Sequence, residues 1–142
     1  GLLRALIDDE SARHDAELAA LQLDRKPWHE QLACLAVHVA RRTSQPELMR
    51  LCDIVMGSGD AAMVEALDNA GPGKAREALL RALAAAVGAE PLHALHSCDD
   101  LCDHFMACIA GRRFGTRAAA GDFQERARRG LDLFLRVLQV RV

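Results

Sequence analysis

The sequence has few aromatic residues and lacks the pattern that forms β-sheets. Phe and Trp together make up 4% of the 142 residues, Tyr is absent, and no stretch alternates β-branched or aromatic residues with polar ones. Strands of a half-buried sheet show that alternation, so its absence excludes a β-rich fold. The scarcity of aromatic rings also argues against a site that binds planar cations by stacking.

Long apolar runs and a strong charge of one sign are missing as well. The longest stretch without a charged side chain, residues 31–40, is about half of what a membrane-spanning helix requires. Acidic and basic residues nearly cancel, with a net charge of −2, which argues against a chain built to neutralise nucleic-acid phosphates. We therefore expect no membrane association and no direct contact with DNA by this chain.

The chain also lacks the residue sets that signal catalysis. No C-x-x-C pair, phosphate-binding glycine loop or Ser-His-Asp set is visible, so we expect no enzyme activity and no cofactor. Five cysteines are present, and an odd number cannot pair fully within one chain. Because no basic and apolar leader opens the sequence, we expect reduced thiols and a cytoplasmic protein.

Ala, Leu, Arg and Glu recur with helical spacing almost throughout, and Pro, Gly and Asn separate the periodic segments. The length suits one domain with one core. We expect an all-α antiparallel bundle of about six to seven helices that forms a single domain over residues 1–142. The predicted helices cover residues 2–23, 27–42, 46–56, 61–69, 72–88, 98–114 and a last helix that begins after Asp122.

Two of these helices have distinct patterns. One face of the first carries apolar residues at its ends and polar residues in the middle, over residues 8–17, which predicts a helix packed at its ends and exposed between them. The second is apolar on every face over residues 31–40 and is predicted to be the central helix. Its His38 either hydrogen-bonds to a structural neighbour or offers a polar contact to a ligand.

Four segments, in this order, resemble the C-terminal regulatory domain of TetR/AcrR-type transcriptional repressors. They are GLLRALI at residues 1–7, PELMRL at 46–51 leading to AGP at 70–72, DLCDHFMACIAG at 100–111, and GLDLFL at 130–135. The resemblance implies a domain that binds a small hydrophobic effector and forms a homodimer. It also implies a helix-turn-helix domain before residue 1, so DNA would be bound only through that absent part.

In such a repressor, an effector between the central helices would tilt the first helix and lower the affinity for the operator. The polar middle of that helix is expected to permit the tilt. The residues expected to line the pocket are Cys34, Leu35, His38, Asp53, Met56, Met63, Leu79, Leu83, Cys102 and Met106. The residues expected at the dimer interface are Phe105, Ile109, Leu131, Phe134 and Leu138.

Two alternatives use the same helices. Cys98 and Cys102 lie one turn apart and, with a nearby histidine, could bind a metal ion or act as a thiol sensor, although small buried cysteines explain the spacing equally. The histidines near this pair are His93, His96 and His104. The second alternative is a helical interaction module that binds no ligand. Asp53 could equally be a solvated residue, and the methionines could equally fill the core.

Overall fold

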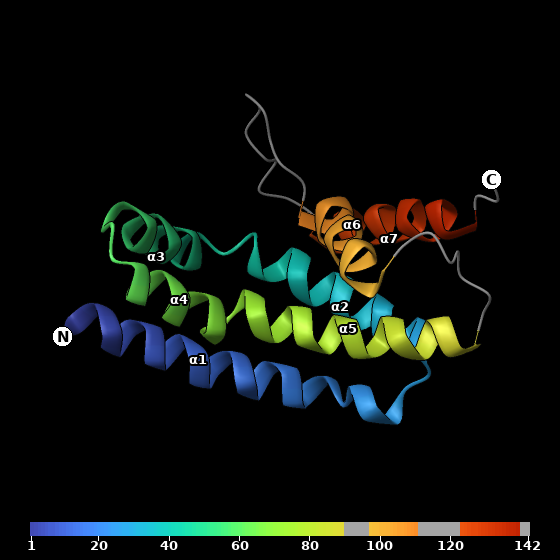
Figure 1. The fold of residues 1–142 in the computed structure, drawn as a ribbon, viewed down its shortest axis with the longest axis horizontal. Coiled ribbons are helices and arrows are strands. Elements are labelled where there is room, and N and C mark those ends of the chain that lie inside the picture. The colour runs from blue at the N-terminus through green and yellow to red at the C-terminus, as the bar shows by residue number, and fades with distance from the viewer. Residues whose placement is uncertain (90–96, 111–122, 140–142) are drawn as a thin grey trace.

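The computed structural model describes residues 1–89, 97–110 and 123–139, and these residues form seven α-helices and no strand (Figure 1). The prediction of an all-α bundle is therefore confirmed. No helix among the described residues is long and apolar enough to cross a membrane. The helices are α1 (Leu2–Leu21), α2 (Trp28–Arg42), α3 (Pro46–Gly57), α4 (Ala61–Ala70), α5 (Pro72–Ala89), α6 (Cys98–Ala110) and α7 (Phe123–Gln139).

The helices begin and end where local chemistry predicts. Pro27 precedes α2, and Pro46 occupies the first turn of α3, where its missing N–H is not needed. The carboxylate of Asp60 accepts hydrogen bonds from two backbone N–H groups at the start of α4, and the Ser97 hydroxyl accepts one at the start of α6. Helix α1 ends two residues earlier than predicted, because Gln22 adopts the left-handed conformation and a short 3₁₀ turn, Leu23–Arg25, follows.

Three helices, α5, α6 and α7, pack around α2. Helix α2 packs mainly against α7 and α5, while α6 packs against both α5 and α7. Helix α1 lies on the opposite side of the molecule from α6 and α7, alongside α4 and α5 (Figure 1). The prediction that the second helix is central is therefore confirmed.

The apolar core consists of two clusters. The larger joins α2, α5, α6 and α7, with Phe105 and Phe134 packed edge to face at 5.3 Å between ring centres. The smaller joins Ile7 of α1 to Val55 of α3 and Leu67 of α4. Leu18, near the C-terminal end of α1, packs against the larger cluster. The polar middle of α1 thus lies between the points at which this helix meets the two clusters.

The structure corrects the prediction for this polar middle. Glu10 and His14 are buried, and they face α2 and α4 rather than solvent. A polar residue is tolerated in such a position only when its hydrogen bonds are satisfied inside the protein. The first helix is therefore attached along its middle, and the partners that allow this come from distant parts of the chain.

Candidate functional site

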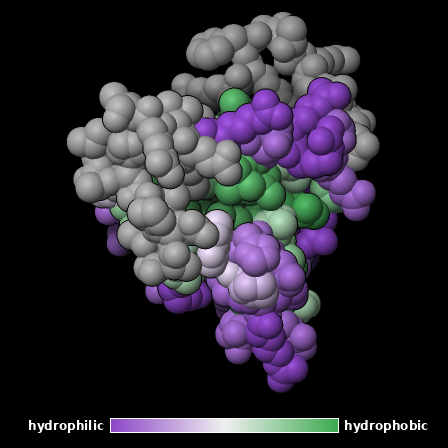
Figure 2. Space-filling view, turned by 90° about the vertical axis from the view of Figure 1, so that its right-hand side faces the viewer, coloured by the Kyte–Doolittle hydropathy of each residue, from purple (hydrophilic) through white to green (hydrophobic). Residues whose placement is uncertain are grey.

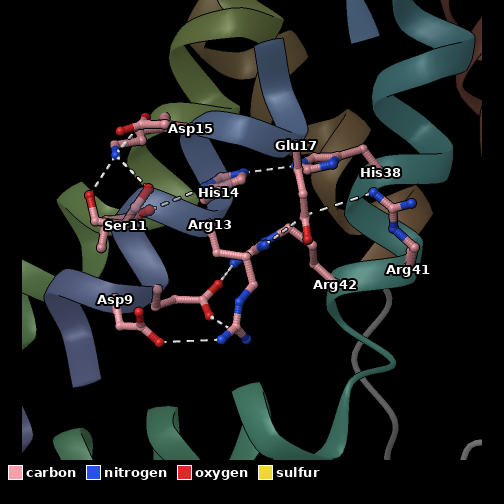
Figure 3. A network of polar contacts seen from close by, with 12 residues as sticks. Asp9, Ser11, Arg13, His14, Asp15, Glu17, His38, Arg41 and Arg42 are labelled. Carbon is pink, nitrogen blue, oxygen red and sulfur yellow. Dashed lines mark hydrogen bonds and ion pairs between the residues drawn. The ribbon is translucent and has the colours of Figure 1, made fainter. Parts of the chain in front are cut away.

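The candidate site is the polar network that joins the middle of α1 to the C-terminal half of α2 (Figure 3). On α1, Glu10, His14 and Glu17 follow one another at intervals of four and three residues, so they share one helix face. On α2, His38 and Arg42 lie one turn apart and face them. These five residues form the network.

At its centre, the two imidazole rings meet end to end. The Nε2 atoms of His14 and His38 are 2.7 Å apart, while the ring centres are 4.9 Å apart and the ring planes lie 8° from parallel. The two nitrogens therefore lie close to the line that joins the ring centres, as in a direct N–H···N hydrogen bond. Both side chains are almost completely buried, with 0% and 1% of their surface exposed.

The surroundings determine which nitrogen carries each proton. His14 Nδ1 lies 3.1 Å from the carbonyl oxygen of Ala70, which only accepts, so Nδ1 of His14 is the donor. A neutral His14 then has a free electron pair on Nε2, and Nε2 of His38 must donate to it. Nδ1 of His38 is left as a buried acceptor with no hydrogen-bond partner among the described residues.

Burial keeps both rings neutral. It lowers the pKa of His38 to about 4, with the positive charges of Arg41 and of a protonated His14 acting in the same direction. Burial also lowers the pKa of His14, although the Ala70 carbonyl and the carboxylate of Glu17 oppose that shift. The neutral tautomers assigned above are therefore the forms present near pH 7.

Arg42 anchors the other end of the network. Its guanidinium donates one hydrogen bond to Glu10 and another, of 2.9 Å, to Glu17, so it joins two carboxylates on successive turns of α1. Burial lowers the pKa of Arg42, but a guanidinium remains charged at any pH at which the protein is folded. Arg13 and Arg41 add weaker ion pairs of 3.8 Å at the edges of the network.

Helices α4 and α5 complete the surroundings. The carbonyl of Ala70, the last residue of α4, holds His14, and a Cβ atom built at Gly71 after it would lie about 4 Å from both His14 and Arg42. Lys74, in the first turn of α5, donates to the Ser11 hydroxyl at 2.6 Å and pairs with Asp15 at 2.7 Å. The α4–α5 junction is thus attached to the same stretch of α1 (Figure 3).

The residues predicted to line a pocket do not gather in one place. His38 belongs to the network. Leu35, Leu79, Leu83 and Cys102 are buried in the larger cluster, Met106 packs at its edge, and Met63 packs against the smaller cluster. Cys34 is half-buried, while Asp53 and Met56 are exposed on α3. The face of α3 that carries Asp53 and Met56 therefore points away from the core.

Two hollows lie along α1 instead. One, of about 450 Å³, opens between the end of α1, α2 and α5, and the other, of about 550 Å³, opens between α1 and α3. Residues of the first hollow are Leu18, Ala19, Gln22, Leu23, Asp24, Gln31, Ala78, Arg81 and Ala85. Figure 2 views the molecule from the side where α5 and α7 end, and it shows hydrophobic surface gathered between hydrophilic surfaces there.

The predicted dimer residues are mostly internal. Phe105, Ile109 and Phe134 are fully covered within the single chain, where they hold α6 and α7 onto α2, so they offer no surface to a second copy. Leu131 is half-buried, and the side chain of Leu138 lies outside the described residues. Leu133, on the outer side of α7, is 54% exposed.

The cysteine and histidine cluster is only partly described, since His93 and His96 lie outside the described residues. Cys102 is buried, Cys98 is half-buried and His104 is exposed. Burial raises the pKa of Cys102. Among the described residues, no three side chains of the kinds that bind metal come together.

The sequence pattern identified the face of α1 that carries the network but not its burial. Spacing placed Glu10, His14 and Glu17 on one helix face. The apolar residues on every side of His38 predicted that this histidine is buried. A buried histidine on the central helix and a histidine on a polar stripe are each unremarkable alone. A neutral imidazole has one hydrogen-bond donor and one acceptor, so each histidine can serve as the partner that the other needs. That match is the signal that could have linked His14 to His38.

No family model, curated protein or solved structure matches this chain. The class that the described residues define is an all-α helical bundle whose first helix is attached to its central helix by buried polar groups.

Proposed function

We propose that the chain is the effector-sensing, homodimerising regulatory domain of a TetR-type transcriptional repressor. A small hydrophobic molecule bound to it would lower the operator affinity of an attached helix-turn-helix domain. The observation that carries the proposal is the polar attachment of α1 to α2 through His14, His38 and Arg42. Hydrogen bonds and ion pairs have discrete partners, so they hold α1 in one defined position. A ligand that binds more tightly to a second position of α1 would shift the helix to that position.

The hollow at the end of α1 is the site at which we place the effector. Its volume of about 450 Å³ suits a small molecule. Leu18, Leu23 and Ala78 give it apolar walls, whereas Gln22 and Arg81 provide polar atoms at its edge. A molecule in this hollow would contact α1, α2 and α5 together and would favour a different angle of α1.

The homodimer would use the outer faces of α6 and α7. Asp99 and Asp103 of α6 pair with Arg76 of α5, and Arg128 and Arg129 of α7 pair with Glu125, so these charges are matched within one chain. A two-fold axis that places α6 of one copy against α7 of the other would cover the exposed Leu133. This arrangement replaces the interface predicted from Phe105, Ile109 and Phe134.

Binding is tested with the amphipathic dye 1-anilinonaphthalene-8-sulfonate. Ala85→Phe fills the hollow, whereas Ala84→Phe adds the same ring one residue away, at an exposed position that does not line it. We expect wild type and Ala84→Phe to bind the dye with equal affinity and Ala85→Phe to bind at least tenfold more weakly. Equal binding by all three would overturn the location of the site.

The oligomeric state is measured separately by light scattering after gel filtration. Leu133→Asp should weaken the dimer, whereas Leu2→Asp, at another exposed leucine, should leave it intact. A monomeric wild type would overturn the dimer. A dimer that binds no hydrophobic probe would favour the helical interaction module.

A further inference from the structure

We propose that the pair formed by His14 and His38 is a proton-sensitive contact, and that uptake of one proton by the pair releases the middle of α1 from α2. The proposal concerns the attachment of α1 and does not depend on an effector.

The end-to-end geometry leaves room for only one hydrogen atom between the rings. With the two Nε2 atoms 2.7 Å apart, one nitrogen must donate and the other must accept. The carbonyl of Ala70 requires a proton on His14 Nδ1, which makes His14 Nε2 the acceptor. The contact therefore requires two neutral rings in one particular pair of tautomers.

An added proton has two places to go, and each leaves a polar group unsatisfied. On His14 Nε2, it makes that nitrogen a donor that faces the N–H of His38, unless His38 moves its own proton from Nε2 to Nδ1. On His38 Nδ1, it creates a buried N–H directly. In the tautomer shift and in direct protonation alike, the proton at His38 Nδ1 meets no acceptor among the described residues.

The charged groups around His14 differ from those around His38 in how well they stabilise an added proton. His14 is faced by Asp15 and Glu17 of α1 and by Lys74 of α5, while α4 contributes the neutral Ala70 carbonyl. His38 is faced by His14 and by the positive charge of Arg41, and these are the charged groups among the described residues that shift its pKa. A cationic pair is therefore opposed on the α2 side by burial and by like charge.

The release is expected to be local. The larger apolar cluster, built from α2, α5, α6 and α7, includes neither histidine, and α1 meets it only through partly buried side chains. Helix α1 would thus separate from α2 while most of the core remains packed. The ion pairs of Arg42 with Glu10 and Glu17 flank the pair and must also break when the middle of α1 opens, so protonation raises the fraction of open molecules and does not open α1 by itself.

The experiment combines nitrogen NMR of the imidazoles with native-state hydrogen exchange, corrected for the intrinsic effect of pH. At pH 7 we expect neutral rings with protons on His14 Nδ1 and His38 Nε2. Between pH 7 and pH 5, protection of the α1 amides should fall at least tenfold relative to the α6 amides. His38→Gln should abolish this relative loss, because a Gln amide can donate to neutral His14 or accept from its cation.

His104→Gln, at an exposed histidine on α6, is the matched control and should keep the wild-type response. If His38→Gln does not fold, the wild-type titration decides: the relative loss of α1 protection must set in as the pH falls below about 6.5, the ordinary pKa of histidine, because the open state then binds more protons than the closed state. The proposal is overturned if α1 and α6 lose protection together, if α1 protection relative to α6 does not change with pH, or if EDTA removes a metal ion bound to the two Nε2 atoms.

Discussion

Gly130 of α7 packs directly against the backbone of Cys108 on α6. A Cβ atom built at position 130 would lie 2.5 Å from the Cys108 carbonyl oxygen and 2.7 Å from Cδ1 of Ile109. The two helices approach so closely because this position has no side chain. The close approach in turn lets Phe105 and Phe134 meet in the larger cluster.

We predict that Gly130→Ala lowers the free energy of unfolding by about 1–3 kcal/mol, because the methyl group must push α6 and α7 apart. Urea unfolding measures the effect. Gly57→Ala is the control, since no described atom beyond the neighbouring residues and the backbone of its own helix lies within 4 Å of the Cβ that it adds. Its effect should be neutral or slightly stabilising, and an equal loss in both variants would refute the packing argument.

Arg42→Met should destabilise the protein by about 3–5 kcal/mol, since it leaves the buried Glu10 and the half-buried Glu17 without their shared cation. Arg136→Met, which breaks the exposed pair with Asp132, should change stability by less than about 1 kcal/mol. Both variants are compared by urea unfolding at pH 7. A small effect of Arg42→Met would mean that the network does not hold α1.

Stability should fall as the pH drops from about 6.5 toward 4. Unfolded histidine has its ordinary pKa of 6.5, whereas burial lowers the pKa of His38 to about 4 in the folded protein. Between these values the unfolded chain binds more protons, so acid favours unfolding.

The carboxylates are common to wild type and His38→Gln, so the difference between their urea midpoints isolates the histidine. That difference should shrink or reverse in favour of His38→Gln as the pH falls from 7.5 to 4.5. A constant difference would contradict the lowered pKa.

The thiols of α6 should react at different rates. Cys102 is fully buried and burial raises its pKa, so we expect it to react with Ellman's reagent at least about tenfold more slowly than Cys98 at pH 8. Cys98→Ser should remove a faster-reacting thiol and Cys102→Ser a slower one. Rapid formation of a Cys98–Cys102 disulfide with peroxide would instead support the thiol-sensor alternative.

The helices were predictable because their signals are local. Pro46, Asp60 and Pro72 lie at helix starts and act within one turn of chain, and the all-round apolar character of α2 predicts its central place. The candidate site was less predictable. His14 and His38 are separated by 24 residues and Glu10 and Arg42 by 32, so no local spacing links them.

The sequence by itself determined the helical class, the starts of the helices and the face of α1 that carries Glu10, His14 and Glu17. Only the tertiary structure decided that this face is buried, because a polar stripe is stable in either water or a protein interior, provided that partners are present. Packing also decided that Phe105 and Phe134 serve the core of one chain, since an apolar stripe does not specify what covers it.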